Sequence, residues 1–237
     1  MNGILYIASG EKYYNEAIRA ISRTKKVMPS VPIALCTDWS EGRYCKEIDF
    51  YMELERPSYT FGDKVNNYYN SPFEKTIFLD TDTYLIDSVD VLFEMLDRFD
   101  VMAAHAPIEE DEIIILPDAF AEMNSGVIAY KKNERAKAMF DLYQSNYEEC
   151  YQYYTIKYND VPPDQPSFRY AVYNTDVQFC FLPHEYNCML DFPCFLSDRV
   201  HVMHGHYKEA IMKMKAEQIN QKTCLRLYSP EHGLLID

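Results

Sequence analysis

Two aspartates follow a short apolar segment and have the spacing of a metal-binding pair. Residues 76–79 read Thr-Ile-Phe-Leu, which is typical of a buried strand, and Asp80 and Asp82 come directly after them. Carboxylate oxygens are ligands that suit Mg2+ and Mn2+, and such sites are usually completed by the phosphate groups of a substrate. Because two close carboxylates repel an anionic phosphate, a divalent cation is needed to bridge them. The pair therefore predicts a metal site; the simpler alternative is a turn whose aspartates cap a helix.

Strands and helices alternate in the half of the chain that holds this pair. Runs rich in β-branched and aromatic residues predict strands, and apolar residues at helical spacing predict helices. The expected strands are residues 3–8, 31–37, 50–54, 76–79 and 101–104, and the expected helices are 11–27, 60–69 and 89–96. Thr60 and Asp63 have the spacing of a capping box at the start of the second of these helices. The alternation predicts parallel βαβ units, which bind ligands at the carboxyl ends of their strands.

The second half of the chain is more mixed. We expect strands at residues 126–130, 177–182 and 200–204, and helices at 134–154, 165–173 and 209–216. The acidic run at residues 109–112 is expected to be a solvated loop, because runs of like charge are best tolerated in water. The chain after residue 221 shows no clear pattern.

The composition excludes several classes of protein. The chain has 23 basic and 37 acidic residues, a formal net charge of −14, so it should repel nucleic acid and anionic membranes. No stretch approaches the ~20 apolar residues of a membrane span, and the first ten residues are typical of a strand, not of a signal peptide. The seven cysteines are odd in number and contain no Cys-x-x-Cys pair, so we expect reduced thiols in a cytoplasmic protein.

Five short motifs occur in the order found in one family of enzymes. They are Leu-Tyr-Ile-Ala-Ser at residues 5–9 with Tyr13 soon after, Lys64 ahead of segment 71–82, Asn-Ser-Gly-Val at 124–127, Asp-Gln at 164–165, and His-Gly-His-Tyr-Lys at 204–208. Over roughly residues 3–210 the chain resembles the glycogenin-like glycosyltransferases of the nucleotide-diphospho-sugar transferase superfamily. The resemblance implies the glycosyltransferase-A fold, a single Rossmann-like α/β domain over residues 1–237 with a mixed central sheet flanked by helices. Its nucleotide-binding half would span about residues 1–104, and its acceptor and sugar half about 105–237.

The resemblance also implies which residues bind the metal. Asp80, Asp82 and His204 are the implied ligands, and the ion is Mn2+ or Mg2+. The alternation of side chains along the last expected strand puts His201 on the face opposite His204, which favours His204. His206 stays open as a competing ligand.

A larger set of residues is implied to bind the donor. It comprises Ala8, Tyr13, Asp38, Lys64, Asp80, Thr81, Asn124, Ser125, Gly126 and Gly205. Tyr13 would stack on the base, unless it packs against the first strand, and Asp38 would contact the base from the end of the second strand. Asn124 and Ser125 would bond the sugar hydroxyl groups from a loop, with Gly126 permitting close approach of the backbone. The alternative for these three is an ordinary turn into a strand.

Three residues are implied to take part in catalysis. Asp164 and Gln165 would orient the donor sugar or stabilise an oxocarbenium-like centre, unless Asp164 only caps the helix that follows it. Lys208, together with Lys64, would neutralise the diphosphate as it leaves; the alternative for each is a solvated surface lysine.

The implied activity is metal-dependent transfer of a sugar from a UDP- or GDP-sugar to a hydroxyl group of a carbohydrate or other acceptor, with retention of anomeric configuration. An inverting enzyme would need a carboxylate base, for which Asp191, Asp198 and the run at 109–112 are candidates. A phosphatase, a nucleotidyltransferase and an inactive carbohydrate- or nucleotide-binding module stay open. A phosphatase would need a second pair of acids after a later strand, and no later expected strand ends in one. A nucleotidyltransferase would need a Gly-rich loop with Arg after the first strand, which Ser-Gly-Glu-Lys at 9–12 matches poorly.

Overall fold

A mixed sheet of seven strands forms the centre of the molecule. The computed structural model describes residues 1–39, 45–106 and 113–235. The strands are β1 (Asn2–Ala8), β2 (Ile33–Thr37), β3 (Phe50–Glu53), β4 (Lys75–Leu79), β6 (Val101–Ala106), β7 (Glu122–Lys131) and β8 (Phe179–Leu182). Their order across the sheet is β3-β2-β1-β4-β7-β6-β8, and β7 is antiparallel to both of its neighbours while the other pairs are parallel. The expected mixed α/β architecture is confirmed.

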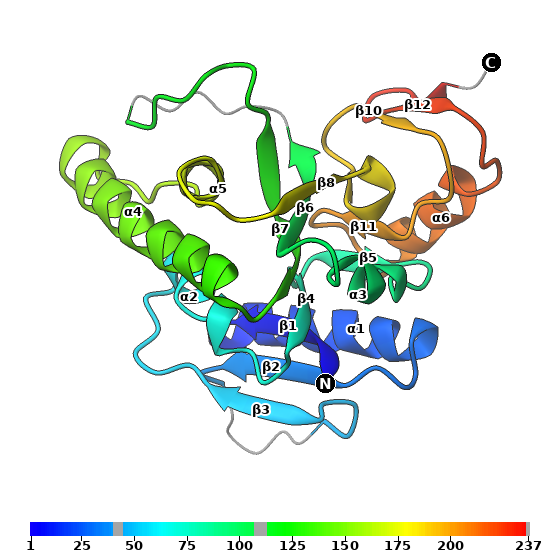
Figure 1. The fold of residues 1–237 in the computed structure, drawn as a ribbon. Coiled ribbons are helices and arrows are strands. Elements are labelled where there is room, and N and C mark those ends of the chain that lie inside the picture. Colours follow the sequence, from blue (N-terminus) through cyan, green and yellow to red (C-terminus); the bar gives the residue numbers. More distant parts are fainter. Residues whose placement is uncertain (40–44, 107–112, 236–237) are drawn as a thin grey trace.

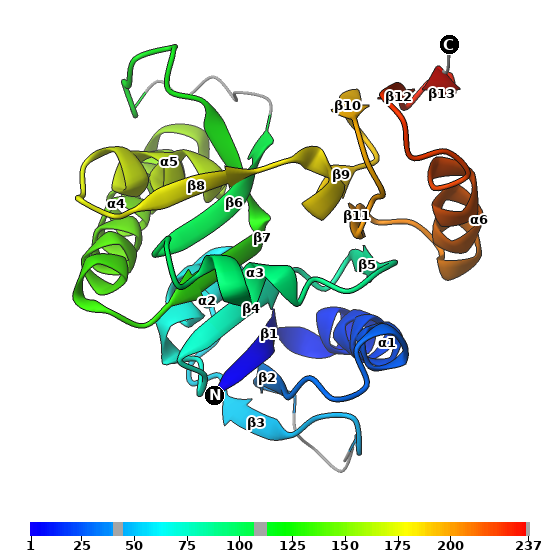
Figure 2. The ribbon, with the colours of Figure 1, turned by 45° about the vertical axis from the view of Figure 1, so that its right-hand side comes forward.

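Helices cover both faces of this sheet (Figures 1 and 2). One face packs against α1 (Gly10–Val27) and α3 (Val91–Met95), and the other against α2 (Gly62–Val65), α4 (Glu134–Tyr158) and α5 (Gln165–Tyr173). Both faces of the sheet are therefore apolar at its centre, which explains why β1, β2 and β4 read as hydrophobic runs.

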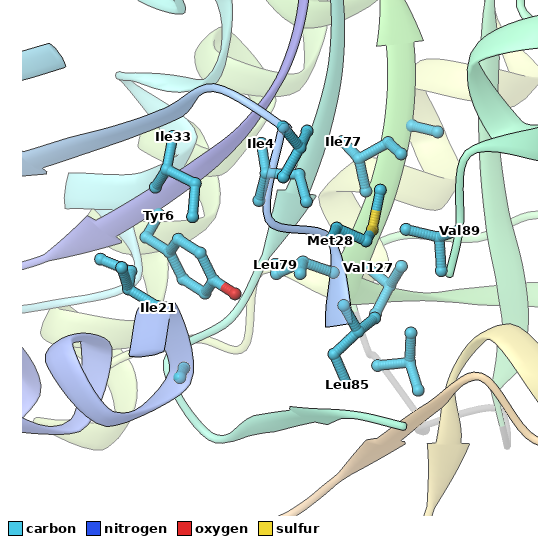
Figure 3. Packing of buried hydrophobic residues seen from close by; sticks show 14 of the residues in the cluster. Ile4, Tyr6, Ile21, Met28, Ile33, Ile77, Leu79, Leu85, Val89 and Val127 are labelled. Atoms are coloured by element: carbon cyan, nitrogen blue, oxygen red, sulfur yellow. The ribbon is translucent and has the colours of Figure 1, made fainter. Parts of the chain in front are cut away.

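Side chains of β1 alternate between the two apolar layers. Ile4 and Tyr6 face the α1 layer, whereas Leu5 and Ile7 face the α4 layer, as the two-residue period of a strand requires. Figure 3 shows Ile4 and Tyr6 packed with Ile21 of α1 and with residues of the neighbouring strands. The Tyr6 hydroxyl forms a hydrogen bond of 2.7 Å with the Thr24 side chain, so its polar atom is satisfied inside the core.

The C-terminal part of the chain returns to the carboxyl end of β4. Two small sheets contain β5 (Thr83–Leu85), β11 (Val202–His204) and β9 (Cys188–Met189) in one, and β10 (Cys194–Leu196), β12 (Arg226–Ser229) and β13 (Gly233–Leu235) in the other. They pack with α6 (Glu209–Ile219) around a third apolar cluster. In the pairing of β11 with β5, His204 lies opposite Thr83, so the sheet itself brings residue 204 next to the Asp80–Asp82 turn.

Several expected elements differ from the structure. Asn124 and Ser125 are buried inside β7, not in a loop before a strand, because pairing with β6 begins at residue 122. The helix expected at 60–69 is wrong: α2 is one turn long and a separate 3-10 helix, η1 (Tyr68–Asn70), follows it. The Asp63 carboxylate accepts hydrogen bonds from the backbone of Ser58 and Tyr59 and does not form a capping box with Thr60.

Other expected boundaries also shift. The helix expected at 89–96 is confined to α3, and the strands expected at 177–182 and 200–204 begin at Phe179 and Val202, so His201 lies outside β11. The chain after residue 221 forms β12 and β13. Another 3-10 helix, η2 (His184–Tyr186), precedes β9. The acidic run at 109–112 lies outside the described residues, and the division into two halves stays a prediction. None of the helices in the described ranges has the length and apolar character needed to cross a bilayer.

Candidate active site

A cavity of about 620 Å³ opens at the carboxyl ends of β1 and β4. Residues expected from the sequence line much of its wall: Tyr13, Lys64, Asp80, Thr81, Asp82, Asn124, Ser125, Asp164, Gln165 and His204. The wall as described does not include five others, which are Ala8, Asp38, Gly126, Gly205 and Lys208. Segments from both ends of the chain thus meet where parallel strands of an α/β sheet usually bind ligands.

Asp80, Asp82 and His204 form a compact group in this cavity. One ligand atom from each lies within 4.8 Å of the others, and His204 Nε2 is 3.2 Å from Asp82 Oδ1 and 4.0 Å from Asp80 Oδ2. Two carboxylates and one imidazole are a donor set that suits Mn2+, and Mg2+ would bind mainly through the oxygens. The residues present therefore fit a divalent cation, and the alternative that the aspartates only cap a helix is wrong, because strand β5 follows them.

Glycine at position 126 makes room for this group. A Cβ atom there would lie 2.2 Å from His204 Cε1 and 2.9 Å from Asp80 Oδ2, both far inside van der Waals contact. The expectation that Gly126 permits close approach thus has a specific form: it admits the side chains of Asp80 and His204, although Gly126 itself does not reach the cavity surface as described.

A chain of amides orients His204. Its Nδ1 is 3.0 Å from Asn187 Oδ1, Asn187 Nδ2 donates to Asn124 Oδ1 at 2.7 Å, and Asn124 Nδ2 donates to Gln165 Oε1 at 2.6 Å. With Nδ1 beside the Asn187 oxygen, the Nε2 atom of His204 faces the carboxylates. Asn187 is fully buried and was not expected from the sequence. It also connects the metal group to the Asn124 and Gln165 side chains.

Burial and neighbouring charges shift the pKa values of Asp80, Asp82 and His204 in different directions. Burial, the largest effect, raises the pKa of Asp80, with Asp82 adding repulsion. For Asp82 burial acts in the same sense, but His204 and then His206 outweigh it and hold its pKa well below the ordinary value. Burial would lower the pKa of His204, yet the Asp82 carboxylate outweighs it and raises that pKa. Negative charge is thus concentrated on Asp82.

The Lys64 ammonium lies between the carboxylates of Asp80 and Asp164. Its Nζ lies 3.2 Å from Asp80 Oδ2, 3.3 Å from Asp164 Oδ2 and 3.2 Å from Ser125 Oγ. Burial would lower the pKa of Lys64, but Asp164 and Asp80 outweigh it and raise it well above the ordinary value. Lys64 is therefore a buried cation and not a solvated surface lysine.

Asp164 faces the cavity and does not cap its helix. Although it occupies the N-cap position of α5, no hydrogen bond to the first turn is found for its carboxylate within the described chain. Its Oδ2 instead accepts a 2.7 Å hydrogen bond from the Tyr143 hydroxyl of α4. Tyr143 is fully buried, and burial followed by the Asp164 charge raises its pKa well above the ordinary value. Tyr143 is a second site residue that the sequence did not single out.

Of the residues expected around the base, Tyr13 lines the cavity, and Asp38 and Ala8 lie beside residues that do. Tyr13 is 40% exposed and lines it, whereas the neighbouring Tyr14 is buried, so packing against the sheet is the role of Tyr14. Asp38 accepts hydrogen bonds from Gly10 N at 2.7 Å and from the hydroxyl of Tyr59, a cavity residue, at 3.1 Å. Ala8 is buried between two cavity residues, Ile7 and Ser9.

Within the His204–Lys208 segment, Gly205 and His206 lie near Asp82, whereas Lys208 is exposed before α6. The Gly205 N–H donates to the Asp82 carbonyl at 3.2 Å, and its φ of +144° is one that favours glycine. His206 is 64% exposed, and its Nε2 lies 3.6 Å from Asp82 Oδ2, outside the three-residue group. Lys208 is exposed directly before α6, so its catalytic role stays a prediction.

Glu16 of α1 is a third residue that the sequence did not single out. Its Oε2 accepts a 2.6 Å hydrogen bond from Thr81 Oγ1, and its Oε1 lies 3.2 Å from His206 Nδ1. The available signal was helical spacing, because Glu16 is three residues after Tyr13 and so shares its side of the helix.

The candidates for an inverting base lie elsewhere. Asp191 accepts a hydrogen bond of 2.6 Å from the Tyr207 hydroxyl, and Asp198 accepts one of 2.7 Å from Arg199 N. Neither belongs to the cavity wall among the described residues. The run at 109–112 lies outside those residues.

Comparison with solved structures identifies the fold. No family model matches the chain, and neither does any curated protein. The galactosyltransferase LgtC, solved with donor and acceptor sugar analogues, superposes with a TM-score of 0.57 at 15% identity over 93% of this chain and 94% of that one. GlyE, a glycosyltransferase of Streptococcus pneumoniae, gives 0.57 at 13% identity over 80% of this chain and 48% of its own. Mouse xyloside xylosyltransferase 1 gives 0.51 at 14% identity over 87% and 98%. The chain therefore has the glycosyltransferase-A fold.

Proposed function

We propose that this protein is a metal-dependent glycosyltransferase that transfers a sugar from a nucleoside-diphosphate sugar to an acceptor hydroxyl group, with retention of anomeric configuration. The observation that carries the proposal is the group of Asp80, Asp82 and His204 in a cavity at the carboxyl ends of the parallel strands. Support comes from LgtC, whose structure contains analogues of donor and acceptor sugars and has the same fold.

The charges in the cavity explain why a cation is required. Four aspartates line it, Asp63, Asp80, Asp82 and Asp164, and the Lys64 ammonium is shared by Asp80 and Asp164. A diphosphate would be repelled by the remaining negative charge, in a chain whose net charge is already −14. A bound Mn2+ or Mg2+ would supply the missing positive charge and stabilise the diphosphate as a leaving group.

The chain's own residues would orient the donor around this point. Lys64 would hold a positive charge beside the diphosphate, since Nζ lies at hydrogen-bonding distance from Asp80 and Ser125. The amides of Asn124 and Gln165 are already tied to each other, so they would present fixed polar atoms to the sugar hydroxyl groups. Tyr13, which lines the cavity, would cover the base.

An assay of donor cleavage tests the proposal. The protein is incubated with a panel of UDP- and GDP-sugars in Mn2+, in Mg2+ or in a chelator, and free nucleoside diphosphate is measured with and without sugar acceptors. We expect release that depends on the metal, is lost in Asp82→Asn and persists in Asp97→Asn, an exposed aspartate paired with Lys75 at the surface.

Two outcomes would contradict the proposal. Donor binding without release under any condition would indicate an inactive binding module, and release of inorganic phosphate from phosphate esters would indicate a phosphatase. NMR of the transferred sugar tests the stereochemistry; a product of inverted configuration would refute retention alone.

A further inference from the structure

His206 is held in the same manner as His204. His204 has Nδ1 3.0 Å from Asn187 Oδ1 and Nε2 3.2 Å from Asp82 Oδ1. His206 has Nδ1 3.2 Å from Glu16 Oε1 and Nε2 3.6 Å from Asp82 Oδ2. In both rings Nδ1 lies beside a side-chain oxygen. The Nε2 atoms face the two oxygens of the Asp82 carboxylate, Oδ1 for His204 and Oδ2 for His206. Metal-bound histidines are oriented in this way by an acceptor on their second nitrogen.

Glu16 connects the two segments that make up the metal group. It comes from α1, 190 residues before His206, and its side chain is 17% exposed. One of its oxygens faces His206, and the other accepts the Thr81 hydroxyl at 2.6 Å. A single carboxylate therefore ties the Asp80–Asp82 turn to the His204–His206 segment.

The backbone around His206 is anchored on both sides. Before it, Gly205 N–H donates to the Asp82 carbonyl; after it, the Tyr207 hydroxyl donates to Asp191 Oδ1 at 2.6 Å. The ring itself is 64% exposed, which leaves room for it to turn toward a cation while its backbone stays in place.

We propose that His206 is a fourth protein ligand of the cation at Asp80, Asp82 and His204, and that Glu16 is the positioning residue that directs its ring. This inference rests on the metal dependence in the proposed function. A second imidazole shifts the preference of the site away from Mg2+, which favours oxygen ligands, and toward Mn2+ and other transition ions.

Pulsed electron paramagnetic resonance of bound Mn2+, without nucleotide, tests the ligand set directly. The method detects the nitrogen nuclei coordinated to the ion. We expect two imidazole nitrogens in the wild type, one in His206→Ala and one in His204→Ala. A single nitrogen in the wild type that persists in His206→Ala would overturn the inference and leave the proposed function intact. Failure of the wild type to bind Mn2+ would refute the metal dependence itself.

Metal affinity, measured by calorimetry on the same proteins, tests the role of Glu16. We expect His206→Ala and Glu16→Ala each to weaken Mn2+ binding by about 10- to 100-fold and to narrow the preference for Mn2+ over Mg2+. Glu16→Gln should restore most of the affinity, because its amide oxygen can still accept the ring N–H.

His232→Ala is the matched control for this measurement. His232 is 66% exposed and lies 3.9 Å from Glu231, so it resembles His206 in exposure and in having a neighbouring glutamate. Its replacement should leave Mn2+ affinity unchanged. Equal affinities in His206→Ala and His232→Ala would overturn the inference.

Discussion

Two clusters of carboxylates lie at opposite ends of the strands of the central sheet, and their charge balance differs. Asp100, at the amino end of β6, is fully buried. It accepts hydrogen bonds from Arg135 at 2.6 Å, Asn133 at 2.7 Å and the Gln178 backbone at 3.0 Å, and Lys131 lies 3.3 Å away. One buried carboxylate thus has two cationic partners.

At the carboxyl end of β4 the balance is reversed. Asp80, Asp82 and Asp164 share Lys64 and His204, and they open into a cavity. The titration of the two clusters differs accordingly. Burial would raise the pKa of Asp100, but Arg135 and the other donors outweigh it and hold that pKa well below its ordinary value. At Asp80 burial prevails and the pKa is raised. We infer that the Asp100 cluster stabilises the fold. The cluster of Asp80, Asp82 and Asp164 has excess negative charge, which a bound cation would neutralise.

The largest expected effect is on the activity of Asp82→Ala. Removing the carboxylate on which negative charge is concentrated should lower the metal-dependent rate of donor cleavage by about a thousandfold. In the proposed function this change would remove a metal ligand and with it the neutralisation of the diphosphate. The rate is measured at saturating Mn2+. Full activity in this variant would show that Asp82 does not take part in the metal-dependent reaction.

The next effect is on stability, at Asp100 beside the amino end of β6. Asp100→Asn should lower the free energy of unfolding by about 2–3 kcal/mol, because it leaves Arg135 and Lys131 without their buried counter-charge. Asp97→Asn is the matched control: its exposed ion pair with Lys75 should contribute less than about 1 kcal/mol. Denaturant unfolding measures both variants. Equal stabilities would mean that the Asp100 cluster is not a structural element.

Acid should remove this stabilisation. Because the pKa of Asp100 is lower in the folded than in the unfolded chain, its contribution is complete above the ordinary carboxyl value of about 4 and is lost as the pH falls toward the folded pKa. The difference in unfolding free energy between wild type and Asp100→Asn should therefore shrink between pH 5 and pH 3, by at most about 1.4 kcal/mol per pH unit. A constant difference over this range would contradict the assignment.

The smallest effect, and one of opposite sign, is expected at Asp80. In metal-free protein, Asp80→Asn removes a charge whose ionisation burial opposes, and Lys64 keeps its contacts with Asp164 and Ser125. The free energy of unfolding should be unchanged or higher by up to about 1 kcal/mol. A loss as large as that of Asp100→Asn would show that the two clusters do not differ in kind.

The sequence predicts well those parts of the site that one local segment determines. Asp80 and Asp82 follow directly from a strand end, and Lys64, Asp164 and His204 from short motifs whose positions line the cavity. Asn124 and Ser125 line it too, but they come from a buried strand, because pairing with β6 overrides the turn signal of Asn-Ser-Gly.

The supporting residues depend on tertiary contacts that one sequence does not display. Asn187 reaches His204, Tyr143 reaches Asp164, and Glu16 reaches His206 across 190 residues of chain. Nothing in the type or local spacing of Asn187 and Tyr143 distinguishes them from other buried positions. For Glu16, helical spacing from Tyr13 indicates the side of the helix but not what the side chain contacts. The turn at Asp63 was missed for a related reason, since its carboxylate bonds backward along the chain and not to Thr60.

Binding of UDP and GDP, titrated by calorimetry into wild-type protein in Mn2+ and in a chelator, tests most directly whether this acidic cavity accepts a diphosphate only together with a cation. We expect saturable binding of at least one nucleotide in Mn2+, at one site per chain, and affinity weaker by at least about a hundredfold in the chelator, because Asp80 and Asp82 then repel the diphosphate. Equal affinity under the two conditions would contradict the account.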